Sequence, residues 1–105
     1  MRILVVCGAG ASSTFVAQRL RTAAAATGLD WDADAGTESA VAHGGHDLVL
    51  VGPHLRERLA MLRTLTSAPV VVLPDDVFAD RDGRRTLLLA QSTLAAAGEA
   101  PKGTP

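Results

Sequence analysis

The chain's only cysteine, Cys7, stands where a short apolar run gives way to small and hydroxyl-bearing residues. The segment from residue 2 to residue 14 reads RILVVCGAGASST, so two glycines and three hydroxyl residues follow the thiol closely. Glycines let a backbone approach a ligand, and successive N–H groups at a helix start bind oxyanions. The same positive field favours a thiolate over a thiol, which predicts a nucleophilic sulfur in an anion-binding loop. The predicted anion-binding residues are Gly8, Ala9, Gly10, Ala11, Ser12, Ser13 and Thr14.

A dinucleotide-binding loop is one alternative for these glycines. Gly8, Gly10 and Ser13 give the spacing G-x-G-x-x-S after an apolar run, and acidic residues follow further on. The fingerprint requires Gly or Ala where Ser13 stands. A full dinucleotide-binding domain also needs about six strands, and this chain has only four predicted strands. Both departures disfavour this alternative.

A cysteine phosphatase is a second alternative, because low-molecular-weight tyrosine phosphatases and related arsenate reductases also place a short loop between a cysteine and a helix. Those enzymes carry Cys-x5-Arg, and the arginine grips the phosphoryl group in the transition state. Here Ser13 occupies the arginine position, and no basic residue lies between Arg2 and Arg19. Backbone dipoles must then meet most of the phosphoryl charge, so we expect slow turnover. A non-catalytic module that senses an anion is the third alternative.

Composition limits the remaining possibilities. The 105 residues suit one domain, and 48% hydrophobic residues are enough for a compact core. A formal net charge of −1 disfavours nucleic-acid binding. One cysteine cannot form an internal disulfide, which favours a reducing cytosol, and the apolar run before it is too short for a signal peptide or a membrane span.

Four short apolar runs predict the strands that position the cysteine. They cover residues 3–7, 29–35, 48–51 and 70–73. Three of them are continuous, which is typical of parallel strands buried on both faces. The run 29–35 alternates apolar residues with aspartates and predicts an edge strand, with Trp31 covering the edge of the sheet. Its apolar residues, expected to share one face, are Leu29, Trp31, Ala33 and Ala35.

Helical patterns lie between these runs. Ser12 or Ser13 is expected to cap the first helix and Gly28 to end it, while Gly98 is expected to end the last. The predicted helices cover residues 12–28, 37–45, 53–67 and 83–98, the second being short and weak. In the third, Pro53 suits the first position, leucines form the core face, and Arg56, Arg58 and Arg63 lie on the solvated face.

The order of elements predicts an α/β fold with right-handed crossovers. We expect a three-layer sandwich whose four-stranded parallel sheet, in the order 2-1-3-4, is flanked by helices, with a phosphatase-like Cys loop after the first strand. Residues 1–98 are expected to form a single domain. Residues 99–105, which carry two prolines and no apolar pattern, are expected to be a flexible tail.

With its glycines and hydroxyls in place, ILVVCGAGASST resembles the phosphocysteine loop of the enzyme IIB component of the sugar phosphotransferase system, lactose/cellobiose class. That loop reads roughly Cys-x-x-Gly-x-Ser-[Ser/Thr]-[Ser/Thr] directly after a first strand. The matching residues are Cys7, Gly10, Ser12, Ser13 and Thr14. The third run ends in LVLVGPHLRERL, whose Gly52, Pro53 and His54 resemble the Gly-Pro-[Gln/His] corner of the same family. The resemblance covers most of residues 2–97.

This resemblance implies a relay. A phosphohistidine on a cognate enzyme IIA would donate its phosphoryl group to Cys7, and the phosphocysteine would pass it to a sugar bound by the membrane permease IIC. The chain would be a cytoplasmic phosphotransferase component that meets the inner face of the membrane through IIC, without inserting directly and without a cofactor. His54, at the start of a helix, is expected to be a secondary residue of the site, which would donate a hydrogen bond to the phosphate.

Two acidic residues are unexpected near a site that would bind a phosphate dianion. Asp75 and Asp76 follow the fourth apolar run, where parallel strands place ligands. They would either raise the electrostatic cost of a bound phosphate or point to solvent. Elsewhere, His43 and His46 in HGGH lack a second ligand pair, so no metal site is expected.

Overall fold

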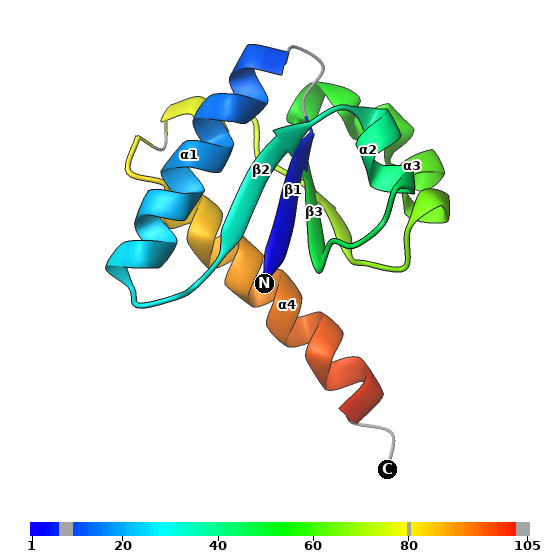
Figure 1. The fold of residues 1–105 in the computed structure, drawn as a ribbon. Coiled ribbons are helices and arrows are strands. Elements are labelled where there is room, and N and C mark those ends of the chain that lie inside the picture. Colours follow the sequence, from blue (N-terminus) through cyan, green and yellow to red (C-terminus); the bar gives the residue numbers. More distant parts are fainter. Residues whose placement is uncertain (7–9, 80, 103–105) are drawn as a thin grey trace.

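The computed structural model describes residues 1–6, 10–79 and 81–102, and for residues 10–13, 78 and 97–102 it describes the backbone alone. Strands and helices alternate along the chain (Figure 1). The strands are β1 (Arg2–Val6), β2 (Asp32–Gly36), β3 (Leu48–Val51) and β4 (Val70–Val72). The helices are α1 (Gly10–Ala26), α2 (Glu38–Ala42), α3 (Leu59–Leu65) and α4 (Arg84–Lys102), with 3-10 segments η1 (Pro53–Arg58) and η2 (Val77–Ala79).

The four strands form one parallel sheet in the order β2-β1-β3-β4, which confirms the predicted order. Val6 at the end of β1 aligns with Gly36 of β2 and with Val51 of β3. Val51 in turn aligns with Val72 of β4. The carboxyl ends of all four strands therefore meet along one edge of the sheet, which we call the carboxyl edge.

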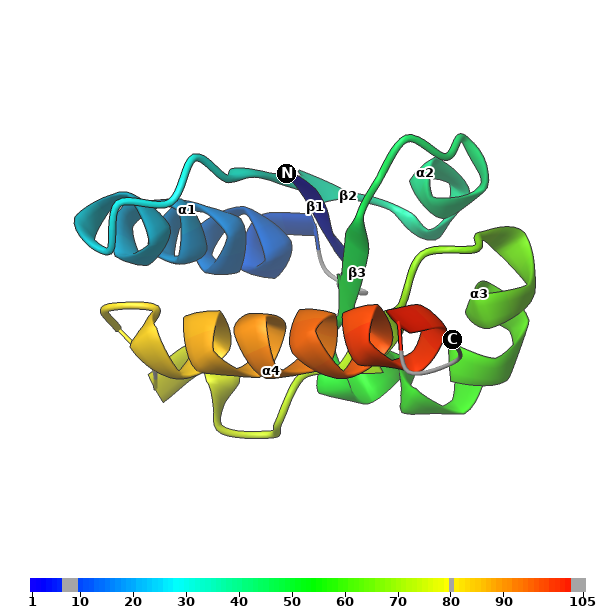
Figure 2. The same cartoon turned by 90° about the horizontal axis from the view of Figure 1, so that it is seen from below.

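Helices cover both faces of the sheet, as the continuous apolar runs predict. Figure 2, which looks along the layers, shows α1 and α4 on one side of the strands and α2 and α3 on the other. Ile3 and Val5 belong to the core beneath α1 and α4, whereas Leu4 and Val6 belong to the core beneath α2 and α3. Successive residues of a strand point to opposite faces, so each buried strand supplies both cores.

The strand at the β2 edge begins later than the sequence pattern predicts. Ala33 is buried and the aspartates beside it are exposed, as expected, and Trp31 packs partly buried against the core beneath α1 and α4. Ala35 lies two residues after Ala33 in the same strand and so points to the same side, as predicted, but it is exposed. An edge strand has a neighbour on one side only, so its end is less covered.

Helix α1 begins at Gly10, so the prediction that Ser12 or Ser13 caps it is wrong. Both serines lie within the first turn instead. The other end follows the prediction: Gly28 has φ +83°, its N–H donates to Ala25 O, and the Leu29 N–H donates to Ala24 O. This pair of bonds is the Schellman arrangement that a glycine favours.

The single helix predicted over 53–67 is two segments, η1 and α3. The residue before η1 is Gly52, which has no side chain to accept a hydrogen bond from the first turn. That turn closes tightly, through a bond of 3.0 Å from the Leu55 N–H to Gly52 O. Leu55 and Leu62 are nevertheless buried in the same core, so the predicted leucine face is confirmed.

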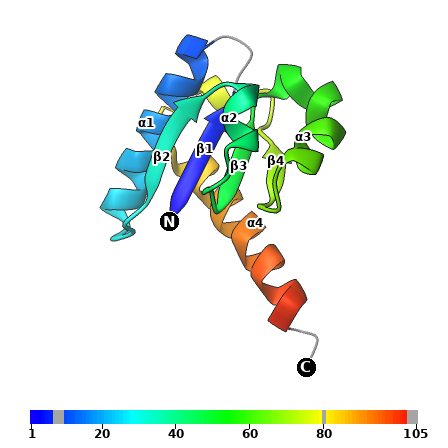
Figure 3. The same cartoon turned by 45° about the vertical axis from the view of Figure 1, so that its right-hand side comes forward.

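Helix α4 continues to Lys102, past Gly98, where the sequence predicted its end. A glycine inside a helix costs about 1 kcal/mol relative to alanine but does not forbid the helix. Among the α4 side chains that the structure describes, Leu94 is the last that packs against the core, and the helix projects beyond the sheet after it (Figure 3). The flexibility of residues 99–105 stays a prediction. Over the described ranges, none of the helices is both long and apolar enough to cross a membrane.

Candidate functional site

Along the chain, the predicted nucleophile, Cys7, stands between β1 and α1. Cys7, Gly8 and Ala9 lie outside the described residues, but Val6 is the buried last residue of β1 and Gly10 is the first of α1. Val6 O accepts a hydrogen bond of 2.7 Å from the N–H of Gly52. The end of β1 therefore lies at the carboxyl edge, next to the corner that follows β3.

The start of α1 is suited to an anion. The first four N–H groups of an α-helix, here those of residues 10–13, have no partner within the helix. The first turn carries no acidic side chain that would offset the positive end of the helix dipole. The predicted backbone donors Gly10, Ala11, Ser12 and Ser13 are thus brought together at the helix start, while Thr14 lies in the same helix just behind them, with an exposed side chain.

The corner after β3 reaches the same edge. Gly52 is buried, Pro53 begins η1, and His54 is the exposed second residue of that segment. Pro53 suits this place because it has no N–H to leave unsatisfied. The structure thus brings His54 to the carboxyl edge, and its action on a phosphate stays a prediction.

Arginines partner the two aspartates after β4, and the sequence pattern did not reveal this. Asp75 Oδ1 lies 3.2 Å from Arg56 Nη2, and Asp76 Oδ2 lies 2.7 Å from Arg85 Nη2. All four side chains are largely exposed. The acidity expected at this edge is therefore offset by paired guanidinium groups from η1 and α4. Periodicity placed Arg56 on a solvated helix face, and only the approach of η1 to β4 gives it this partner.

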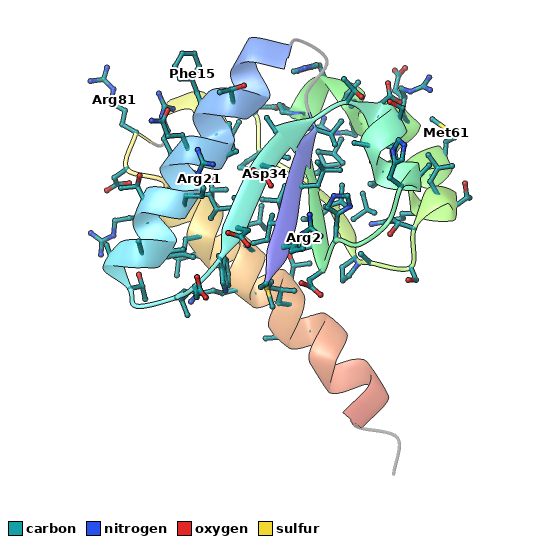
Figure 4. The ribbon with its side chains drawn as sticks, in the orientation of Figure 1. Arg2, Phe15, Arg21, Asp34, Met61 and Arg81 are labelled. Atoms are coloured by element: carbon teal, nitrogen blue, oxygen red, sulfur yellow. The ribbon has the colours of Figure 1, made fainter. Side chains whose placement is uncertain are left out.

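A third ion pair lies at the same edge. Glu38 begins α2, shortly after β2 ends, and its Oε1 accepts a close hydrogen bond from Arg58 Nε. Two other arginines, Arg2 and Arg21, lie away from this edge. Arg2 stands at the amino end of β1, where its backbone N–H donates to Asp47, and Arg21 faces Asp34 across α1 and β2 at 3.9 Å (Figure 4).

A surface hollow of about 490 Å³ lies away from this edge, between the second half of α1 and the first half of α4. It is lined by Thr22, Ala23, Ala26, Thr27, Asp82, Arg84, Leu87, Leu88 and Gln91. It contains none of the predicted site residues. Within the part of the chain that the structure describes, no group of three or more histidine, cysteine or acidic side chains is arranged to hold a metal ion.

The comparisons agree with this architecture. A solved structure, the lactose-specific IIB component domain of the phosphoenolpyruvate:carbohydrate phosphotransferase system from Streptococcus pneumoniae, superposes with a TM-score of 0.73. The match covers 89% of this chain and 96% of that one at 16% sequence identity, so it bears on the fold. No curated protein matches the sequence. The family described as "PTS system, Lactose/Cellobiose specific IIB subunit" matches residues 2–87, and the chain therefore belongs to this family.

Proposed function

We propose that this chain carries a phosphoryl group on Cys7 during sugar uptake. Membership of the lactose/cellobiose IIB family supports a role in sugar phosphotransfer within the phosphotransferase system. The observation that carries the finer proposal is the start of α1. Helix α1 begins at Gly10, shortly after the buried end of β1 at Val6, and the first four N–H groups of an α-helix have no partner within it. Cys7 is the residue bonded to Val6.

The proposed reaction has two displacements at phosphorus. The thiolate of Cys7 attacks a phosphohistidine of enzyme IIA, so a P–S bond forms, the P–N bond breaks, and the imidazole keeps the electron pair. A hydroxyl of the sugar bound by IIC then attacks the phosphocysteine. The P–S bond breaks, the thiolate is restored, and the hydroxyl proton leaves to a base at the sugar site. The helix start holds the phosphoryl oxygens in both steps.

The absence of an arginine in the loop sequence supports transfer over hydrolysis. Ser13 stands where a phosphatase carries its transition-state arginine. Backbone N–H groups bind the phosphoryl group when it arrives, but they give less stabilisation to the charge that develops during attack by water. The phosphocysteine then survives until the sugar hydroxyl replaces water as the acceptor.

The proposed partners follow from this chemistry. The donor is a cognate enzyme IIA, and the acceptor is a sugar held by the IIC permease. The chain works in the cytoplasm and reaches the inner face of the membrane through IIC. Residues 10–14 contribute binding, together with Gly8 and Ala9, and His54 is a further proposed donor to phosphate.

Intact-mass measurement tests the proposal. The full chain is incubated with phosphoenolpyruvate, the general phosphotransferase proteins and a IIA of the lactose/cellobiose class. We expect one phosphate to appear on the wild type and none on Cys7→Ser, and peptide mapping should place it on residue 7. Hydrolysis of an aryl phosphate by an unmodified wild type would instead support the cysteine phosphatase. Phosphate binding without either reaction would support the sensing module.

A further inference from the structure

We propose that the surface hollow between α1 and α4 is a docking groove for an acidic amphipathic helix of a partner protein. We call this hollow, with the nine lining residues given above, the α1–α4 groove. The structure describes every residue that lines it, and none of them belongs to the predicted phosphate site. The inference therefore does not depend on the proposed function.

The walls of the groove have a shape that accepts a helix. On the α4 side the lining residues are Arg84, Leu87, Leu88 and Gln91, which share one helix face over two turns, about 10 Å. On the α1 side all the lining residues are alanines and threonines, whose small side chains let another helix approach closely. The volume of about 490 Å³ lies within the range of about 300–1,000 Å³ for binding pockets. A third helix laid along these walls would place apolar side chains, spaced at i, i+3 or i+4 and i+7, in the groove.

Leu88 leaves an apolar surface open in the groove. Its side chain is 64% exposed, the largest exposed fraction among the large apolar side chains that the structure describes. Leu87 beside it and Ala23 on α1 are buried, so the floor of the groove is covered while Leu88 projects from one wall. Exposed apolar surface with a polar rim is typical of an interaction site. We therefore expect Leu88 to supply most of the apolar contact with the partner.

Unpaired positive charge lies at one end of the groove. Arg84 lines the groove from the first turn of α4, and no ion pair joins its guanidinium to another described residue. A second hollow shares Asp82 and Arg84 with the groove and adds Arg81, which likewise has no ion pair with a described residue. Asp82 offsets part of this charge, but its Oδ1 already accepts a hydrogen bond of 3.2 Å from the N–H of Arg84. Charge complementarity therefore favours an acidic partner.

The groove and the carboxyl edge are far enough apart to be used at the same time. Figure 1 shows the start of α1 at the end of the molecule where β1 also ends. Thr22, the first residue of α1 that lines the groove, comes twelve residues after Gly10, about 18 Å along the helix. A partner held in the groove would leave the carboxyl edge open, so it could stay bound while that edge meets other proteins.

Titration of the full chain with designed peptides tests the inference. The probe is a synthetic helical peptide with leucines at positions i, i+4 and i+7 and a pair of glutamates at each end, so that either orientation brings an acidic group to Arg84. Backbone N–H signals in NMR spectra report both the affinity and the place of binding. We expect saturable shifts centred on residues 22–27 and 82–91, with a dissociation constant of about 0.1–1 mM because the contact is small. The same peptide with lysines in place of the glutamates should bind at least about fivefold more weakly.

Single variants locate the contact, and circular dichroism checks that each of them is folded. Leu88→Gln should weaken binding of the glutamate peptide at least about tenfold. Leu65→Gln is the matched control, because Leu65 is also an exposed leucine but lies on α3, in the opposite layer, and it should leave the affinity unchanged. Arg84→Glu should reverse the preference, so that the lysine peptide binds more tightly than the glutamate peptide. Arg56→Glu, at an exposed arginine outside the groove, is the control for charge and should change either affinity by less than about twofold.

Four results would overturn the inference. Equal affinities of the glutamate and lysine peptides for the wild type would remove the charge complementarity. A peptide with a central proline that binds as tightly would show that the groove takes an extended chain and not a helix. Shifts of the same signals when the chain alone is concentrated would assign the groove to a second copy of this chain. Unchanged signals of residues 22–27 and 82–91 at about 2 mM peptide would show that the groove is not a docking site.

Discussion

Ser13 distinguishes this cysteine loop from that of a phosphatase. It stands six residues after Cys7, in the position of the arginine of Cys-x5-Arg. An arginine there would bind the equatorial oxygens of the phosphoryl group and neutralise charge in the transition state. In the carrier function that we propose, a serine would leave that work to the N–H groups at the start of α1, which suits storage of the phosphoryl group better than its release to water.

Substitution of Ser13 by arginine should therefore convert storage into hydrolysis. We expect phosphorylated Ser13→Arg to lose its phosphate to water at least about ten times faster than the wild type, because one well-placed cationic donor lowers the barrier by more than about 1.4 kcal/mol. The decay is followed by intact mass after removal of IIA. Ser13→Gln, long and polar but uncharged, is the control, and equal decay of the two variants would contradict the argument.

At the scale of elements, one glycine decides how closely the start of α4 approaches α1. Gly83 has φ +73°, and a Cβ built on it would lie 2.3 Å from the carbonyl oxygen of Arg19. The obstacle is backbone, so it cannot move aside as a flexible side chain would. The turn before α4 and the middle of α1 are therefore in contact only because residue 83 has no side chain.

Gly83→Ala should destabilise the fold by about 2–4 kcal/mol, the sum of left-handed backbone strain and a clash with backbone. Chemical denaturation measures this loss. Gly44→Ala is the matched control, since Gly44 also has φ +73° but a Cβ there meets nothing within 4 Å. Its cost should be about 1–2 kcal/mol, the strain alone. Equal costs at the two positions would show that the close approach to Arg19 is unimportant.

The end of α4 allows a second prediction at the scale of elements, about the stability of shortened chains. Leu94 is the last of the described α4 side chains that packs against the core, so a chain of residues 1–98 keeps every described core contact. We expect its melting temperature to lie within about 2 °C of that of the full chain. A chain of residues 1–91 removes Leu94 and should melt several degrees lower, by about 4 °C or more. A large loss in the 1–98 chain would contradict the predicted domain boundary.

At the scale of the whole molecule, the sheet joins two cores into one unit. Neighbouring residues of β1 and β3 point into opposite cores, so neither core can lose its packing while the sheet stays intact. The single tryptophan, Trp31, packs against the core beneath α1 and α4, whereas Leu62 is fully buried in the core beneath α2 and α3. The two residues report on opposite faces.

Leu62→Ala should lower the free energy of unfolding by about 2–5 kcal/mol, the usual cost of such a cavity. Because unfolding is expected to be a single cooperative transition, Trp31 fluorescence and circular dichroism should shift by the same amount. Leu88→Ala, at a side chain that is 64% exposed, is the control and should change stability by less than about 0.5 kcal/mol. A fluorescence transition that stays in place in Leu62→Ala would show two independent cores.

The sequence alone determined the four-stranded parallel sheet and the order of its strands. Continuous runs such as that of β3 can be buried only between two layers of helices, and alternation of aspartates in β2 marks an edge. These are local patterns of period and polarity, which the chain carries without reference to distant residues. The family could be recognised from the sequence for the same reason, since its loop and its Gly52-Pro53 corner are short contiguous motifs.

Only the tertiary structure decided which charges meet at the carboxyl edge. The pairing of Arg56 with Asp75 joins residues 19 positions apart in sequence, and it depends on how η1 leaves β3 and how β4 packs beside it. The start of α1 also differs from the prediction, because its first turn begins at Gly10 and not after a capping serine. Periodicity predicts which side of an element is exposed, whereas the partner that an exposed charge finds depends on the packing of neighbouring elements.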